Sequence, residues 1–118
     1  MDDRKNLKAA LIKLGIENKY EEVLTKKNIN GSTTKFENDK LIWVDLSNFG
    51  LTQLPEGVFD GLGSLQELKL YKNQISELPE SIFDKLPELG EIHLKDNKLT
   101  NLRKRHFQNN PKLHRVLL

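Results

Sequence analysis

Residues 65–88 read LQELKLYKNQISELPESIFDKLPE, which is one complete unit of an internal repeat. Its apolar residues stand at places 1, 4, 6, 11, 14, 19 and 22 of a 24-residue unit, and the same spacing continues on both sides. The column of first leucines is Leu41, Leu65, Leu89 and Leu113. A phenylalanine column with the same step is Phe59, Phe83 and Phe107. A fixed period of this length indicates a repeat protein, in which each unit packs only against its neighbours.

The pattern LxxLxLxxNxLxxLPxxxFxxLxx resembles that of the leucine-rich-repeat family in its typical 24-residue form. The resemblance covers roughly residues 41–118, as units 41–64, 65–88 and 89–112 and a partial unit 113–118. It implies an α/β fold: a short leucine-rich-repeat solenoid with a parallel β-sheet on the concave face, behind an N-terminal helical cap. Such motifs are specific for the fold and say little about the partner.

Each unit is expected to contain a strand at LxxLxL, with its leucines inward, followed by a turn. At that turn the amide of Asn73 is expected to bond to the backbone of neighbouring coils. Two units depart from the pattern. Phe49 takes the asparagine place of the first unit, where the adjacent Asn48 is its expected substitute. In the third unit Arg103 replaces proline and Asn110 replaces leucine, so we expect a looser or differently shaped convex side.

Residues 1–40 are expected to form the helical cap and a linker. An apolar stripe predicts a helix over residues 3–14, which an aspartate begins and Gly15 ends. A second helix is predicted over residues 17–27, ended by Asn30-Gly31, and then a loop or short edge strand around Phe36. Residues 1–30 are either a separate interaction module or a lid over the first coil. The lid is favoured, because so short a segment cannot build its own core.

Alternation along each strand places every second side chain on the concave face. One predicted column is Trp43, Glu67, Glu91 and Arg115, and the other is Asp45, Lys69, His93 and Leu117. Ser47, Tyr71 and Lys95 extend this face. We predict that these residues bind a partner protein, with Trp43 and Tyr71 as aromatic anchors. Two alternatives stay open: Trp43 packs beneath the cap, or the charged columns are cross-strand pairs on a solvated sheet.

The expected concave face is small. Four strands about 4.8 Å apart make a sheet about 14 Å wide, with strands about 16 Å long. This area is below the roughly 800 Å² that each partner buries in a standard interface. We therefore expect a flanking surface to contribute to binding.

The C-terminal strand is a candidate for self-association. It leaves backbone groups and the apolar Val116 and Leu118 uncovered. We predict that this edge pairs with a second copy to give a homodimer, or that a partner covers it. The alternative is a frayed tail, with Asn110-Pro111 as the true stop of the fold.

Charge is unevenly distributed although the net charge is only +2. Residues 56–96 contain nine acidic and four basic residues, whereas residues 103–118 contain five basic residues and no acidic one. The basic end suggests binding to nucleic acid or an anionic membrane. Because interleaved aromatic residues are missing, we expect a solvated rim or a patch for an acidic partner instead.

The chain contains no cysteine, which excludes disulfides, thiolate zinc sites and cysteine nucleophiles. The three histidines lack metal-ligand spacing along the chain, so we expect no metal, no cofactor and no enzyme activity. We expect a cytoplasmic protein, since no signal peptide is evident; export by a route without an N-terminal mark stays open.

Three functional hypotheses result from the sequence. The first is a protein–protein interaction module that acts as an adaptor, inhibitor or effector. The second is a self-associating structural unit that uses the C-terminal strand. The third, a binder of nucleic acid or anionic membrane through the basic end, is the least favoured.

Overall fold

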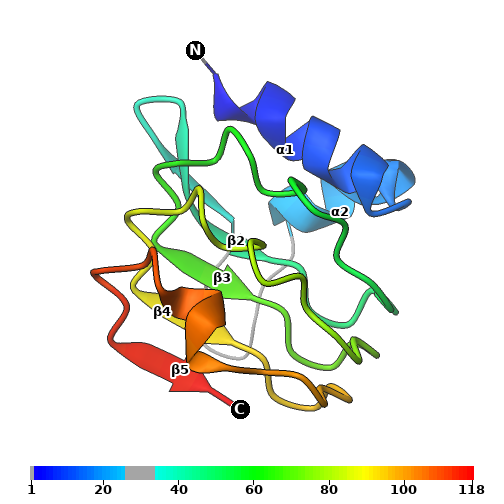
Figure 1. The fold of residues 1–118 in the computed structure, drawn as a ribbon. Helices are drawn as coiled ribbons and strands as arrows, with labels where there is room; N and C mark the ends of the chain where they lie inside the picture. The colour runs from blue at the N-terminus through cyan, green and yellow to red at the C-terminus, as the bar shows by residue number, and fades with distance from the viewer. Residues whose placement is uncertain (1, 26–33) are drawn as a thin grey trace.

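Stacked coils with one sheet along their side form the molecule in the computed structural model, which describes residues 2–25 and 34–118 (Figure 1). The helical elements are α1 (Asp3–Lys13), η1 (Glu17–Lys19), α2 (Tyr20–Thr25) and the later η2 (Lys104–Phe107). The strands are β1 (Lys35–Glu37), β2 (Lys40–Asp45), β3 (Glu67–Lys69), β4 (Glu91–His93) and β5 (Arg115–Leu117). The expected α/β solenoid, with a parallel sheet along one side and a helix at the N-terminal end, is confirmed.

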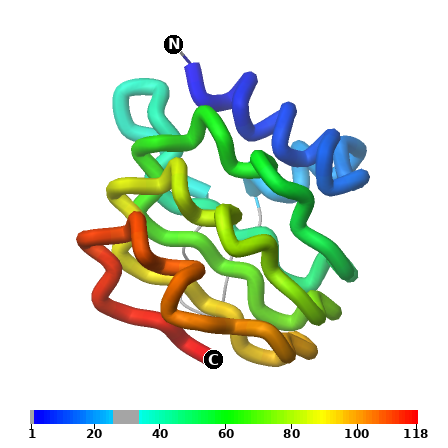
Figure 2. The backbone as a smooth tube through the Cα atoms, in the orientation of Figure 1, coloured from blue at the N-terminus to red at the C-terminus, as the bar shows by residue number. Residues whose placement is uncertain are grey.

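The sheet has the strand order β1-β2-β3-β4-β5. Strand β1 pairs antiparallel with β2, which confirms the edge strand expected around Phe36. The other strands are parallel, and their pairing confirms both predicted columns: Trp43–Glu67–Glu91–Arg115 and Asp45–Lys69–His93–Leu117. The return segments of successive coils run side by side away from the sheet, as the green, yellow and orange stretches of Figure 2 show. A constant 24-residue step thus becomes a constant register between strands.

The phenylalanine column is stacked inside the coils. The ring centroids of Phe59 and Phe83 are 6.4 Å apart, and those of Phe83 and Phe107 are 5.6 Å apart. The rings are almost parallel, with interplanar angles of 14° and 5°. Phe59 and Phe83 are fully buried, whereas Phe107 is only partly buried because it lies in the last complete coil.

Asparagine side chains connect the coils at the turns after β3 and β4. The Asn73 carbonyl oxygen accepts hydrogen bonds from the backbone of Phe49 and Leu51, and its amide donates to Leu46 and Leu70. This confirms the role expected of Asn73 at the turn. The substitution expected for Asn48 is wrong: that residue is exposed and has a left-handed backbone, with φ of 60°.

The convex side of the third unit is differently shaped but not loose. It contains the short helix η2, where the other units have turns. Asn110 is buried and its amide donates to the carbonyl oxygens of Phe83 and Leu86, each at 2.9 Å. His106 is also buried and lies 2.8 Å from the carbonyl oxygen of Leu78. Polar side chains thus replace apolar packing with bonds to the preceding coil.

Helix α1 packs across the first coil (Figure 1). Asp2 caps its start by accepting from the Arg4 backbone, and Gly15 follows its end with φ of 75°. The inward side chains of the helix belong to the same core as the repeats; they are Leu7, Ala10 and Leu11. These contacts favour a lid over a separate module.

Polar contacts fix the position of α1. Asp3 is buried, and its carboxylate accepts the Leu41 backbone N–H at 2.8 Å. The Asn6 amide donates to the carbonyl oxygen of Gly61 at 3.1 Å. A Cβ on Gly61 would lie 3.0 Å from the Asn6 side chain, and its φ is +88°. Glycine is therefore needed where the first coil meets the helix.

The second predicted helix is divided into η1 and α2, with Val23 buried against the core and Tyr20 and Leu24 packed on it. Its predicted stop at Asn30-Gly31 lies outside the described residues. Among the residues that the structure describes, no helix has the length and apolar character that crossing a membrane requires.

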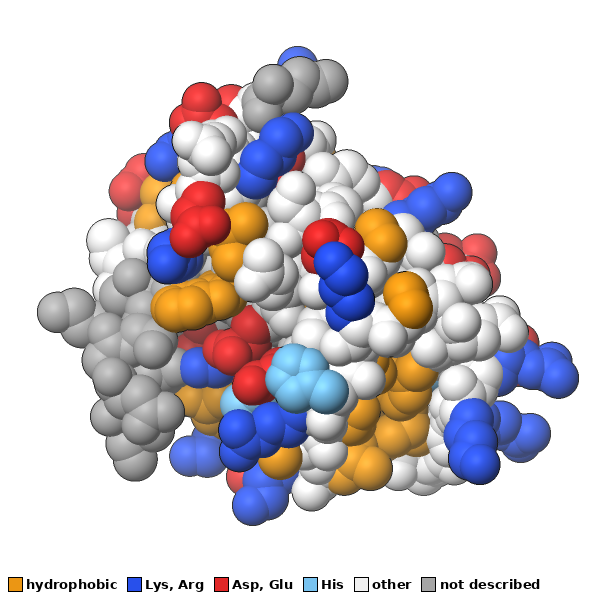
Figure 3. Space-filling model, turned by 90° about the vertical axis from the view of Figure 1, so that its left-hand side faces the viewer, with side chains coloured by type: hydrophobic (Ala, Val, Ile, Leu, Met, Phe, Trp, Pro, Cys, Tyr) orange, Lys and Arg blue, Asp and Glu red, His pale blue; other side chains and the backbone are white. Residues whose placement is uncertain are grey.

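At the C-terminal end, β5 pairs with β4, so the alternative of a frayed tail after Asn110-Pro111 is wrong. Val116 packs partly against the core, whereas Leu118 keeps 65% of its surface exposed. Figure 3 shows hydrophobic side chains along this lower end of the molecule.

Candidate functional site

The concave face presents a central band of half-exposed side chains. Trp43, Glu67, Tyr71, Glu91 and His93 are all partly exposed. Toward the C-terminal strand, Lys95 and Arg115 are exposed and Leu117 is partly exposed. The sheet therefore displays an aromatic and charged surface, as its alternation predicts.

Three residues that were expected to stand exposed on this face are buried instead, and the prediction is wrong for them. They are Asp45, Ser47 and Lys69, with 4%, 1% and 9% of their surfaces exposed. The Asp45 carboxylate accepts hydrogen bonds from both the backbone and the hydroxyl of Ser47, which holds these short side chains against the strand end. The Lys69 ammonium bends back to Glu67, 3.3 Å away. Local pairing therefore withdraws these polar groups from the surface.

Trp43 is neither fully exposed on the concave face nor buried beneath the N-terminal cap. It pairs with Lys35 of β1 in the sheet register, and the Lys35 ammonium lies 4.8 Å from the centre of the indole ring. The ring is partly covered by this cation–π contact but also lines the wall of a groove.

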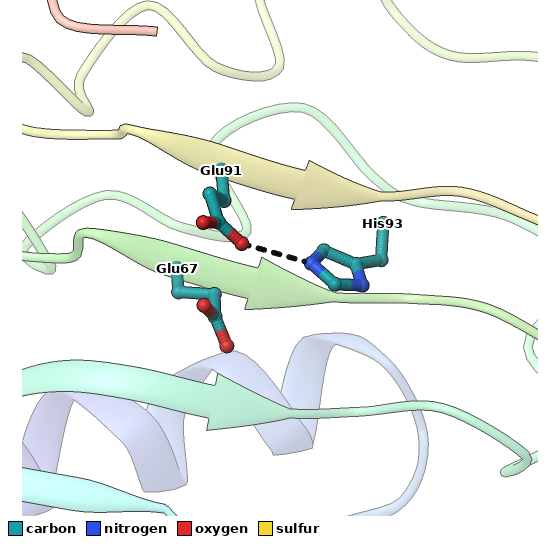
Figure 4. Close-up of side chains that lie close together, drawn as sticks. All are labelled: Glu67, Glu91 and His93. Carbon is teal, nitrogen blue, oxygen red and sulfur yellow. Dashed lines mark hydrogen bonds and ion pairs between the residues drawn. The ribbon is translucent and has the colours of Figure 1, made fainter. Parts of the chain in front are cut away.

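Glu91 is the centre of a charged network on the sheet (Figure 4). The His93 ring donates from Nε2 to Glu91 Oε2 at 3.2 Å. On the other side, Oε1 lies 4.0 Å from both His114 Nε2 and Arg115 Nη1. Glu67 lies directly opposite Glu91 on the neighbouring strand. Two carboxylates and two imidazoles thus meet at one point of the concave face.

Burial raises the pKa of Glu91, because removal from water disfavours a charged carboxylate. The hydrogen bond with His93 lowers the pKa of Glu91, and the nearby positive charge of Arg115 lowers it further. The net result is a pKa below the ordinary value of 4.5. Glu91 therefore stays an anion at neutral pH.

A groove of about 590 Å³ joins the concave face to the edge where the strands begin. It is lined by Trp43, Gln66, Glu67, Glu88, Gly90, Glu91, Lys112 and His114. Figure 3 looks onto this side and shows acidic side chains and histidine at its centre. A Cβ on Gly90 would lie 3.0 Å from the His114 ring, so this glycine makes room for the imidazole beside Glu91.

Sequence reasoning missed the groove because it considered only the outward strand places. Gln66, Gly90 and His114 all occupy the second place of their units, and so does Ile42. A search of that column would have shown a small residue between two polar ones. The groove extends the concave face sideways. It is therefore a candidate for the flanking surface that the small sheet was expected to need.

The basic C-terminal segment is paired with acidic residues of the preceding coil. Lys112 contacts Glu88 at 2.9 Å, Arg105 contacts Glu80 at 3.8 Å, and Arg115 approaches Glu91. The acidic middle and the basic end thus partly neutralise each other. This arrangement favours the expected solvated rim.

One set of described side chains has the composition of a metal site. The donor atoms of Glu67, Glu91 and His93 all lie within 4.8 Å of one another. Spacing along the chain did not indicate this set, because Glu67 comes from a different coil. Strand register brings the three together.

Residues 65–118 match the family described as leucine rich repeat. No curated protein matches the chain in sequence. Among solved structures, one chain in the crystal structure of the Drosophila melanogaster SNF/U2A' complex is similar to it, with 22% sequence identity and a TM-score of 0.46. The similarity covers 75% of the present chain and 63% of that chain, which is less than two thirds of its length.

Proposed function

We propose, from the premise that residues 65–118 are leucine-rich repeats, that the protein is a protein–protein interaction module. It binds its partner through the concave face and the adjoining groove. Occupying a partner's surface in this way suits an adaptor, an inhibitor or an effector.

The observation that carries the proposal is the half-exposed Trp43 at the junction of sheet and groove. Aromatic side chains that are partly covered and surrounded by charges supply most of the binding energy at many protein interfaces. Tyr71 offers a second aromatic group farther along the next coil. The sheet has five strands and is therefore only about 19 Å wide, so the groove adds flanking surface that a standard interface needs.

Affinity purification with the whole chain, followed by mass spectrometry, identifies partners, and calorimetry with a purified partner then measures each variant. Trp43→Ala is expected to weaken binding more than about 10-fold, as loss of an anchor does. Tyr71→Ala is expected to act in the same direction.

The matched control is Ile12→Ala, which removes an apolar side chain that is 57% exposed on the outer side of α1. It is expected to bind like the wild type. Wild-type affinity for both aromatic variants, with their circular dichroism unchanged, would move the site off the concave face.

A second candidate function is self-association through β5. A hollow of about 270 Å³ at this end is lined largely by leucines, among them Leu102 and the exposed Leu118. Pairing of β5 with a second copy would cover both the strand edge and these side chains. Light scattering is expected to give a dimer mass for the wild type and a monomer mass for Leu118→Lys. A monomer in both cases rejects this candidate.

A further inference from the structure

The concave face holds a set of donor atoms that suits a transition-metal ion. Glu67 and Glu91 are directly opposite each other on β3 and β4, and His93 follows two residues later on the same face of β4. Their donor atoms converge to within 4.8 Å (Figure 4). The backbones of all three residues belong to paired parallel strands, so their positions do not depend on a loop.

The negative charges of Glu67 and Glu91 also favour binding of a cation. Like charges directly across neighbouring strands destabilise a sheet. Lys69 offsets part of this repulsion at Glu67, and Arg115 approaches one oxygen of Glu91 only to 4.0 Å. Among the described residues, no Lys, Arg or His side chain forms an ion pair with both Glu67 and Glu91. A divalent ion between the two carboxylates would neutralise both.

The neighbouring groove supplies a further donor and access from solvent. His114 Nε2 lies 4.0 Å from Glu91 Oε1, and its ring can occupy this place because Gly90 has no side chain. The three central side chains keep 22%, 23% and 19% of their surfaces exposed, in the order Glu67, Glu91, His93. An ion can therefore reach them, and they retain freedom to adjust.

We propose that Glu67, Glu91 and His93 bind a divalent transition-metal ion, with zinc the best fit and His114 as a fourth ligand. Imidazole nitrogen combined with carboxylate oxygen suits zinc, whereas magnesium and calcium prefer oxygen alone. Zinc ligands at about 2.0–2.1 Å stand about 3.4 Å from each other in a tetrahedron. The donor atoms of Glu67, Glu91 and His93 must therefore approach one another by up to about 1.4 Å, a change that side-chain rotation supplies.

The test is calorimetric titration of the untagged whole chain with zinc chloride at neutral pH. Saturable binding of one ion per chain is expected. His93→Gln is expected to weaken zinc binding more than about 10-fold, and magnesium chloride is expected to give no comparable heat. Glu88→Gln is the matched control, because this acidic residue lines the same groove but pairs with Lys112 outside the set. It is expected to bind zinc like the wild type.

Nuclear magnetic resonance of the wild-type histidine rings gives an independent readout that needs no variant. One equivalent of zinc is expected to shift the ring nitrogens of His93 and leave the buried His106 unchanged. The proposal is overturned if the wild type shows no saturable zinc binding, if folded His93→Gln binds zinc as tightly, or if His93 does not shift. Because these measurements involve no partner, their outcome is separate from that of the proposed function.

Discussion

His106 shows how one polar residue can serve the core of this solenoid. It stands in the column of Val58 and Ile82, and like them it is buried. Its Nδ1 accepts the backbone N–H of Arg103 at 3.0 Å, so we assign the proton to Nε2, which donates to the carbonyl oxygen of Leu78. The imidazole thus bonds two coils where its counterparts only pack.

His106→Ala is expected to lower the free energy of unfolding by about 1–3 kcal/mol, because it leaves a backbone donor without its partner and opens a cavity. Chemical denaturation measures the change. The exposed His114→Ala is the control, with an expected effect within about 0.5 kcal/mol. Equal, small effects of both variants would show that the buried bonds contribute nothing.

The cap of α1 makes stability depend on pH. The hydrogen bond from the Arg4 backbone lowers the pKa of Asp2; desolvation opposes this effect, and the Arg4 guanidinium reinforces it. Between the ordinary value of 3.8 and the lowered folded pKa, the unfolded chain binds a proton and the folded chain does not. The contribution is therefore complete above 3.8 and is lost as the pH falls through the folded pKa.

Asp2→Asn keeps a capping side chain but removes this charge. Denaturation of both proteins from acidic to neutral pH is expected to show the wild type more stable at neutral pH, with the difference disappearing in acid. A difference that instead grows as the pH falls would contradict this linkage.

At the scale of elements, the asparagine ladder couples each strand to the next coil. Asn73 forms hydrogen bonds with two backbone donors and two backbone acceptors, and Asn97 contacts Ile75, Leu70 and Leu94 in a similar way. The turns contain little regular structure of their own. Their backbone groups therefore depend on these amides for partners.

Asn73→Ala is expected to lower the free energy of unfolding by at least about 3 kcal/mol, because several buried backbone groups lose their partner together. The adjacent Gln74 is exposed, and Gln74→Ala serves as the control with little expected change. Thermal denaturation of both variants distinguishes loss of the Asn73 hydrogen bonds from a general sensitivity of the turn to substitution. Similar melting temperatures for the two variants would refute the role of the ladder.

For the whole molecule, the main feature is one core that runs from the cap into the repeats. Leu7 and Leu11 of α1 belong to the same buried cluster as Phe59, Phe83 and Leu89. A solenoid end must be covered to exclude water from the first coil. The helix is thus part of the folding unit, and it and the repeats should unfold together.

Leu11→Ala is expected to destabilise the protein by about 2–5 kcal/mol, as truncation of a buried leucine does. Helix loss followed by circular dichroism and repeat unfolding followed by Trp43 fluorescence should shift by the same amount. If only the helical signal shifts and Trp43 keeps its transition, the cap is a separate module.

The site could be predicted only in part. Strand alternation predicted the columns that contain Trp43, Glu67, Glu91 and His93, because register depends only on the repeat period. It did not predict burial of Asp45 and Lys69, because local side-chain pairing decides which polar groups remain exposed. The groove beside His114 depends on the absence of a side chain at Gly90, in another coil.

The repeat by itself determined the stacked coils, the inward leucine and phenylalanine columns, and the parallel register, since each follows from a 24-residue period and alternation within it. Which side chains meet between coils depends on the packing of the folded chain. Glu67 with Glu91 and His93, and His106 with Leu78, are contacts across one full coil or more. Such contacts depend on how far each coil is displaced from the next and on which rotamers the neighbours leave free.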